Sequence, residues 1–306
     1  MNASSWLKKC EAVTRWFRRV PTLDLVPLLM VTLLLVTTPV ANWLREPLLV
    51  LLAAGVAFRP ALRSPAYWLA IAACCGTTLL YTWESADNHR YLIFYACIAF
   101  AAVFSLPRHI QSTALRFNAR LLIGFCMLLA VIWKAINVDY IDGTFFHLTL
   151  LTDSRFQHFA SWLGNLPLDA LVANRELVDM VTNGYLRQVD VAHVVLVDSW
   201  QLHTIAFFLT WWTVFIEGAL GVLFLLPDKP RIAWARNSLL ILFAVTTYSV
   251  ATVRGFGWTL MVLGIAQCRR QERGFRLAYM VGFLLIQLYV LPWESMVRGL
   301  SGWFSQ

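Results

Sequence analysis

Long apolar runs recur along the 306 residues of this chain, at lengths that approach the thickness of a lipid bilayer. A helix needs about 20 mostly apolar residues to cross a hydrocarbon core of ~30 Å. Hydrophobic residues make up 59% of the chain and charged residues only 14%, whereas about a quarter of a soluble domain is charged. The pattern therefore predicts an all-α, polytopic membrane helical bundle instead of the two soluble domains that the length alone would suggest.

The sequence predicts about nine membrane spans. They are Leu25–Leu44, Pro47–Phe58, Pro65–Thr82, Tyr91–Leu106, Leu121–Asn137, Leu202–Leu226, Ile232–Val253, Phe256–Gln267 and Leu277–Trp293. Two of them, 47–58 and 256–267, are short enough to be re-entrant, so the expected number is eight to nine. The chain then divides into a basic N-terminal segment (1–24), spans one to five (25–137), an extracytoplasmic segment (138–200) and spans six to nine (201–306).

Basic residues indicate the orientation of the bundle. Trp6–Val20 alternates five lysines and arginines with aromatic and aliphatic residues, which predicts an amphipathic helix in the membrane interface and not a signal peptide. With a cytoplasmic N-terminus and nine spans, 17 of the 25 lysines and arginines fall on the inner side and seven on the outer side. This excess favours an inner-membrane protein of a bacterium, with an extracytoplasmic C-terminus, and disfavours nucleic-acid binding.

The outer segment is acidic and contains short amphipathic pieces such as Leu171–Val181, interrupted by Pro167 and Gly184. Long loops without structure are uncommon unless they are functional. We expect short helices packed across the outer mouth of the bundle.

Metal and thiol chemistry have little support in the sequence. No CxxC pair occurs among the six cysteines. His147 and His158 lie eleven residues apart and His193 and His203 ten apart, far from the close spacing of a helical metal site. No metal ligand set is expected.

Ionisable residues inside predicted spans are candidate functional residues. Glu217 lies about 13 Å from the inner end of its predicted helix and must be paired, protonated or facing a polar cavity. Lys134 lies roughly 5 Å from the outer end of its span, where a desolvated amine can act as a general base and where a lysine can also simply reach the headgroups. On these counts the two differ in depth by roughly 10 Å, so a direct ion pair would need a tilted or broken helix.

Asp139 and Asp142 flank Tyr140 directly after the fifth span, and Gly143 follows them. Aspartates at such a position serve as turn and helix N-cap residues.

The stretch Lys134–Gly143 (KAINVDYIDG), the glutamate in Trp212–Gly218 (WTVFIEG) and the basic loop Pro227–Arg231 (PDKPR) together resemble the HTTM (horizontally transferred transmembrane) family. Those proteins are bacterial relatives of the transmembrane part of vitamin K-dependent gamma-carboxylase. The resemblance implies a multi-helix bundle with a reaction chamber near one face. It implies Lys134 as the base, Asp139 and Glu217 as residues that shape the chamber, and a reduced quinone as a candidate cofactor.

Three differences separate the chain from the carboxylase. Ala135 replaces one of two adjacent lysines, and without gaps it takes the place of the catalytic one. No histidine follows His203, whereas relatives often carry one after the basic loop. The sequence also has no counterpart of the large lumenal domain, so gamma-carboxylation itself is not expected.

Two classes of function remain open from the sequence. The first is a membrane-embedded enzyme that acts on a lipid-soluble or peptide substrate at the outer mouth of the bundle. The second is a non-catalytic scaffold or transport subunit that docks a protein or peptide partner through residues 138–200. A polar path lined by Tyr81, Glu84, Thr210 and Tyr248 would favour transport.

Overall fold

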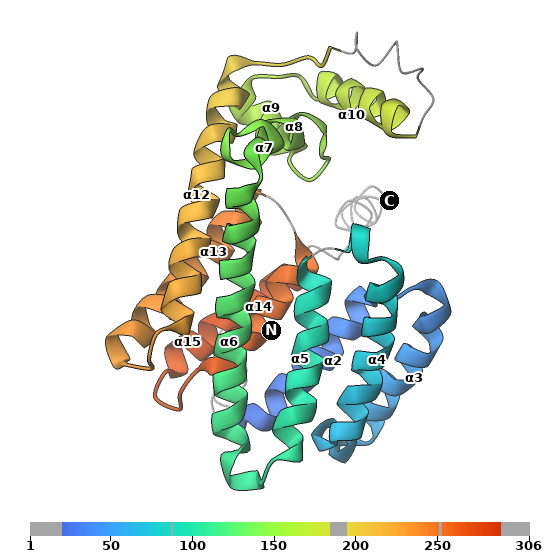
Figure 1. The fold of residues 1–306 in the computed structure, drawn as a ribbon, viewed down its shortest axis with the longest axis vertical. Coiled ribbons are helices and arrows are strands. Elements are labelled where there is room, and N and C mark those ends of the chain that lie inside the picture. Colours follow the sequence, from blue (N-terminus) through green and yellow to red (C-terminus); the bar gives the residue numbers. More distant parts are fainter. Residues whose placement is uncertain (1–19, 87, 184–194, 251–252, 289–306) are drawn as a thin grey trace, which may run out of the picture. The chain divides into compact units, whose positions relative to one another are not determined.

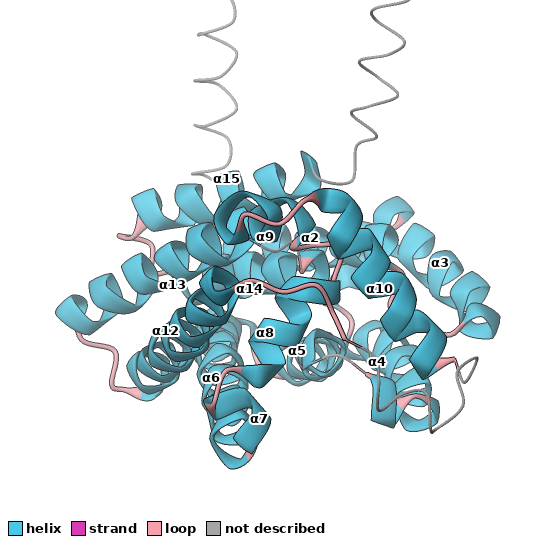
Figure 2. Cartoon of the chain, turned by 90° about the horizontal axis from the view of Figure 1, so that it is seen from above, coloured by secondary structure: helices cyan, strands magenta, loops and turns pink. Residues whose placement is uncertain are grey.

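The computed structural model describes residues 20–86, 88–183, 195–250 and 253–288, and within these ranges it contains helices and loops but no strand (Figures 1 and 2). The α-helices are α2 (Thr22–Thr37), α3 (Asn42–Ala57), α4 (Pro65–Tyr81), α5 (Asn88–Ser105), α6 (Arg108–Ile136), α7 (Val138–Ile141), α8 (Thr144–Thr152), α9 (Gln157–Gly164), α10 (Leu168–Thr182), α12 (Trp200–Leu225), α13 (Pro230–Val250), α14 (Arg254–Gln267) and α15 (Arg273–Leu288). The all-α prediction is confirmed for this part of the chain.

The chain forms two compact units. Unit 1 comprises 1–126, 224–244 and 253–306, and unit 2 comprises 127–223 and 245–252. Helices α2–α5, α14 and α15 belong to unit 1, and α7–α10 with most of α12 belong to unit 2.

Helix α14 is the central element of unit 1 and packs against α2, α5 and α15. Nearly all of its residues are buried, as expected for a helix that is apolar on every side. Its contact with α15 is close because Gly264 lies under the ring of Tyr279, and the indole of Trp258 donates a hydrogen bond to the Phe283 carbonyl at 3.1 Å. The sequence marked 256–267 as a short run, and the structure gives a 14-residue helix here.

Unit 2 contains the C-terminal part of α6 and most of α12, which run antiparallel, since Gly221 faces Leu128 and Gly218 faces Val131; the short helices α7–α10 follow α6. A small apolar core joins α8, α9 and α10 to the first turns of α12. Its buried members are Leu150, Leu151, Phe156, Ala160, Leu166, Leu171, Leu202 and Ala206. The prediction of short helices in the segment 138–200 is confirmed for its described residues.

Asn174 of α10 forms hydrogen bonds with Val197, in the stretch of chain that leads into α12. Its side-chain amide donates to the Val197 carbonyl and its oxygen accepts from the Val197 N–H, both at 2.8 Å. The Asn174 side chain is fully buried, whereas Val197 is half exposed. The segment therefore has specific tertiary structure of its own.

Two predicted boundaries are wrong. The run Leu25–Leu44 is divided between α2 and α3, because Thr38 adopts a left-handed conformation (φ 37°) and Pro39 follows it. Helix α6 begins at Arg108 and not at Leu121. Its polar first half is amphipathic and buries Leu115 and Ala119, which a search for continuous apolar runs overlooks.

Helices α6 and α12 are the two described helices that are long and apolar enough to cross a membrane. Their most apolar windows are only 22% and 33% buried, so large apolar side chains such as Phe125, Leu129, Phe208 and Phe215 are exposed. The predicted N-terminal helix 6–20 and the end of the last predicted span lie outside the described residues.

Candidate functional site

Lys134 and Glu217 form a direct ion pair within unit 2. Lys134 lies in the last turn of α6 and Glu217 in the second half of α12. The ammonium Nζ donates to Oε1 and to Oε2 of the carboxylate, at 2.6 Å each. The side chains are only 16% and 11% exposed, so the charges are largely removed from solvent. The ammonium and the carboxylate therefore neutralise each other through short, charge-assisted hydrogen bonds.

Glycines on α12 bring the two helices close enough for this contact. A side chain at Gly221 would meet the backbone nitrogen of Leu128 at 3.0 Å, and one at Gly218 would meet Val131 at 3.9 Å. Small residues allow helix backbones to approach closely. The close approach sets the register in which Lys134, one turn after Val131, reaches the carboxylate.

The expected difference in depth between Lys134 and Glu217 is therefore wrong. It assumed that α6 and α12 end at the same level. Helix α12 instead extends past the end of α6, and its early residue Phe207 lies against Gly143 in the turn between α7 and α8. Glu217 lies about 25 Å along α12 from Trp200, beside the last turn of α6.

Tyr140 covers the ion pair from the side of α7. Its ring lies 5.0 Å from the Lys134 ammonium, within the range of a cation–π contact, and its hydroxyl lies 2.8 Å from the Thr213 hydroxyl. Burial raises the pKa of the Tyr140 phenol. The ring also stacks on Phe145 at 5.4 Å. The ammonium is thus enclosed by one carboxylate and one aromatic face.

Asp139 does not contact the Lys134–Glu217 pair. Its side chain is exposed and forms no hydrogen bond or ion pair with Lys134 or Glu217. Asp142 accepts a hydrogen bond from the Thr144 N–H at 2.9 Å, which lowers the pKa of its carboxyl and agrees with the expected turn role. Of the three predicted site residues, the structure unites Lys134 and Glu217.

A histidine pair lies in unit 2 that sequence spacing did not reveal. His147 of α8 contacts Asp198 with Nε2 at 2.8 Å, and its ring centroid lies 5.1 Å from that of His203 on α12. In the sequence, the spacings considered were those of His147 to His158 and of His193 to His203, and not the pair His147 and His203. His193 lies outside the described residues. Among the described residues, no group of three or more histidine, cysteine or acidic side chains is arranged to hold a metal ion.

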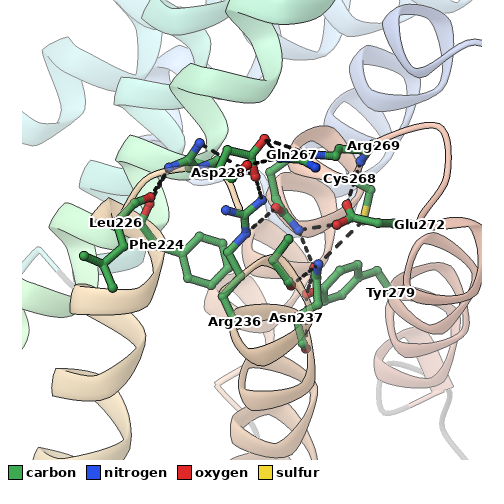
Figure 3. A network of polar contacts seen from close by, with 12 residues as sticks. Phe224, Leu226, Asp228, Arg236, Asn237, Gln267, Cys268, Arg269, Glu272 and Tyr279 are labelled. Atoms are coloured by element: carbon green, nitrogen blue, oxygen red, sulfur yellow. Dashed lines mark hydrogen bonds and ion pairs between the residues drawn. The ribbon is translucent and has the colours of Figure 1, made fainter. Parts of the chain in front are cut away.

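A buried polar network lies in unit 1 around Asp228, in the loop between α12 and α13 (Figure 3). Asp228 accepts from Nη2 of Arg236 at 2.7 Å and from Nε of Arg269 at 2.9 Å, and Nη1 of Arg120 lies 4.0 Å away. Burial opposes ionisation of Asp228, but the hydrogen bonds from Arg269 and Arg236 outweigh it and hold the pKa of the carboxyl below its usual range. Arg236 is fully buried.

The network continues through neutral side chains toward α15. Gln267 accepts from Nε of Arg236 at 3.1 Å and donates to the side-chain oxygen of Asn237. The Tyr279 hydroxyl donates to the same oxygen at 2.7 Å (Figure 3). The sequence predicted Arg236 only as one of the inner basic residues. The one sequence feature that could have indicated this network is Asp228, a single acidic residue within the basic stretch PDKPR.

Comparison with known proteins adds no relative: no family model, no curated protein and no solved structure matches the chain. The functional evidence is therefore the chemistry of the residues themselves. Lys134 and Glu217 form a largely buried acid–base contact in which neither residue has a further ion-pair partner among the described residues.

Proposed function

We propose that the chain is a polytopic inner-membrane protein of about nine spans. The exposed apolar surfaces of α6 and α12 support this, because soluble proteins rarely leave large contiguous apolar patches uncovered. The helices α2, α4 and α14 are apolar but shorter, as tilted or partly spanning helices of a bundle can be.

Contacts within unit 1 support the proposed orientation. Asp228 joins Arg120, Arg236 and Arg269, which come from three segments that the nine-span topology places on the cytoplasmic side. Arg276 donates to the carbonyl of Val20, at the end of the basic N-terminal segment. Segments on opposite sides of a membrane could not make these contacts, so their clustering favours one common side.

Within this bundle we propose that Lys134 and Glu217 are the acid–base pair of a membrane-embedded enzyme of the HTTM type. The observation that carries the proposal is the direct, largely buried ion pair. A buried ion pair contributes little net stability, because removing two charges from water costs about as much as their attraction returns. Ionisable residues within membrane helices are therefore functional candidates.

The geometry favours a division of roles different from the one expected from sequence. An ammonium has three donors and no acceptor, whereas the carboxylate of Glu217 can accept a proton. Glu217 would therefore take a proton from the substrate, and the Lys134 ammonium would stabilise the negative charge that remains on it. A lipid-soluble hydroquinone suits this arrangement, because its hydroxyl supplies the proton and its oxyanion would lie against Lys134. The peptide substrate stays open as an alternative.

The test uses a photoreactive hydroquinone analogue and the purified protein in lipid nanodiscs. We expect labelling of the wild type that is lost in Glu217→Gln and Lys134→Met. The exposed variant Glu46→Gln serves as the control and should label normally. Equal labelling of all four proteins would contradict a site at this pair.

A second function is favoured by one feature of the segment 138–200. Its helices have their own core, yet Trp162 on α9 is 80% exposed. Exposed tryptophans are common both at protein interfaces and at membrane surfaces. A non-catalytic scaffold would use this face to dock an extracytoplasmic protein or peptide. Trp162→Ala would then abolish crosslinking to the partner and leave hydroquinone labelling unchanged.

A further inference from the structure

A cavity of about 480 Å³ opens in unit 1, where the start of α2 and the loop between α14 and α15 meet α6. Among the described residues that line it, none is acidic. Five are arginines: Arg116, Arg269, Arg270, Arg273 and Arg276. The cavity lies in unit 1, whereas the Lys134–Glu217 pair lies in unit 2, and the cavity plays no part in the function proposed above.

Most of this positive charge has no partner within the described residues. Arg116, Arg270 and Arg273 form no ion pair there, and Arg270 and Arg273 are exposed. Nε of Arg276 is buried without a hydrogen-bond partner.

The remaining arginine of the cavity, Arg269, is paired with Asp228, which it shares with Arg236. Glu272 accepts a hydrogen bond from the backbone N–H of Arg269 and forms no ion pair with the described residues. One shared carboxylate therefore faces several guanidinium groups, which repel one another at short range.

Two helices begin at the cavity, each with an acidic residue at its start: Asp24 in the first turn of α2 and Glu272 directly before α15. Helix α2 begins beside the cavity with Pro21 as its N-cap and without a side-chain cap; the N–H groups of Asp24 and Leu25 donate to the Pro21 carbonyl, which leaves those of Thr22 and Leu23 for a ligand. Helix α15 begins at Arg273, on the cavity wall. The N-terminal end of a helix carries a partial positive charge and attracts anions.

We propose that this arginine cavity binds a phosphate-bearing anion. Guanidinium groups bind phosphate oxygens with paired hydrogen bonds, and several of them together match more than one phosphate oxygen. The volume is that of a small-ligand pocket. Basic pockets between helices on the cytoplasmic side suit anionic lipid headgroups, and a soluble phosphate compound offers the same chemistry.

The test measures the increase in melting temperature of the full chain in neutral detergent. The probes are pyrophosphate, phosphatidylglycerol and, as the uncharged comparison, phosphatidylcholine. The variants are R270Q/R273Q, in which neither arginine has a described structural contact, and R270K/R273K, which keeps the charge. Arg59→Gln removes an exposed arginine outside the cavity and is the matched control.

We expect pyrophosphate or phosphatidylglycerol to raise the melting temperature of the wild type and of Arg59→Gln equally. R270Q/R273Q should need at least about tenfold more ligand for the same increase, with R270K/R273K in between. A response to pyrophosphate, with or without one to phosphatidylglycerol, assigns a soluble phosphate compound, and a response to phosphatidylglycerol alone assigns a lipid headgroup. No response of the wild type, or equal weakening in Arg59→Gln, overturns the proposal.

Discussion

The ammonium of Lys134 lies 2.6 Å from both carboxylate oxygens of Glu217, although the two residues are 83 positions apart in the sequence. One is in the last turn of α6, and the other is well inside α12. Neither residue has another ion-pair partner among the described residues. Each charge therefore depends on the other, and this dependence can be measured.

Removing one member of the pair should be costly. Glu217→Gln leaves the Lys134 ammonium without a counter-charge in a largely buried position. We expect a loss of about 3–5 kcal/mol in the free energy of unfolding, measured by denaturant titration in mixed micelles. Asp169→Asn, which changes an exposed aspartate of α10, is the control. A Glu217→Gln protein as stable as this control would show that the pair is not buried as described.

The close approach of α6 and α12 predicts opposite effects for two neighbouring glycines. Gly221→Ala pushes a methyl group against the backbone of Leu128 and should destabilise the protein by about 1–3 kcal/mol. Gly218→Ala meets only ordinary contact at 3.9 Å and gains up to about 1 kcal/mol of helix propensity. Thermal unfolding of the two variants side by side checks this, and an unaffected Gly221→Ala protein would contradict the register.

The Asp228 network predicts a loss of stability in acid. The folded protein lowers the pKa of Asp228, so ionised Asp228 contributes stability above the usual aspartate pKa of about 3.9. That contribution is lost as the pH falls through the lower pKa of the folded state. The melting temperature should therefore fall steeply below about pH 4, and Asp228→Asn should be less stable near neutral pH and less sensitive to acid. A variant with the same acid dependence as the wild type would contradict this role.

The apolar runs predicted most of the helices because burial and membrane insertion both act through continuous hydrophobicity. Helix α4 was predicted to within one residue. The first half of α6 was missed because its arginines and polar side chains share the helix with the buried Leu115 and Ala119. Neither an amphipathic helical turn nor a loop contains a continuous apolar run, so hydrophobicity alone does not distinguish them.

Pairings between helices could not be predicted in the same way. Lys134 and Glu217 were recognised individually as buried ionisable residues, but their contact depends on the register that Gly221 and Leu128 set. The Asp228 network joins three segments far apart in sequence, and no local pattern encodes that meeting. The arginine cavity is also formed by residues from segments that are far apart in the sequence.

We propose that the Lys134–Glu217 pair serves function and not stability, and the double variant Lys134→Met/Glu217→Met tests this most directly. Replacing a buried ion pair by apolar side chains is often neutral or stabilising. The measurement is hydroquinone-analogue labelling in nanodiscs, together with the melting temperature. We predict a protein that melts at or above the wild-type temperature and has lost its labelling. A double variant that keeps full labelling would contradict the claim and leave the pair as a structural contact between α6 and α12.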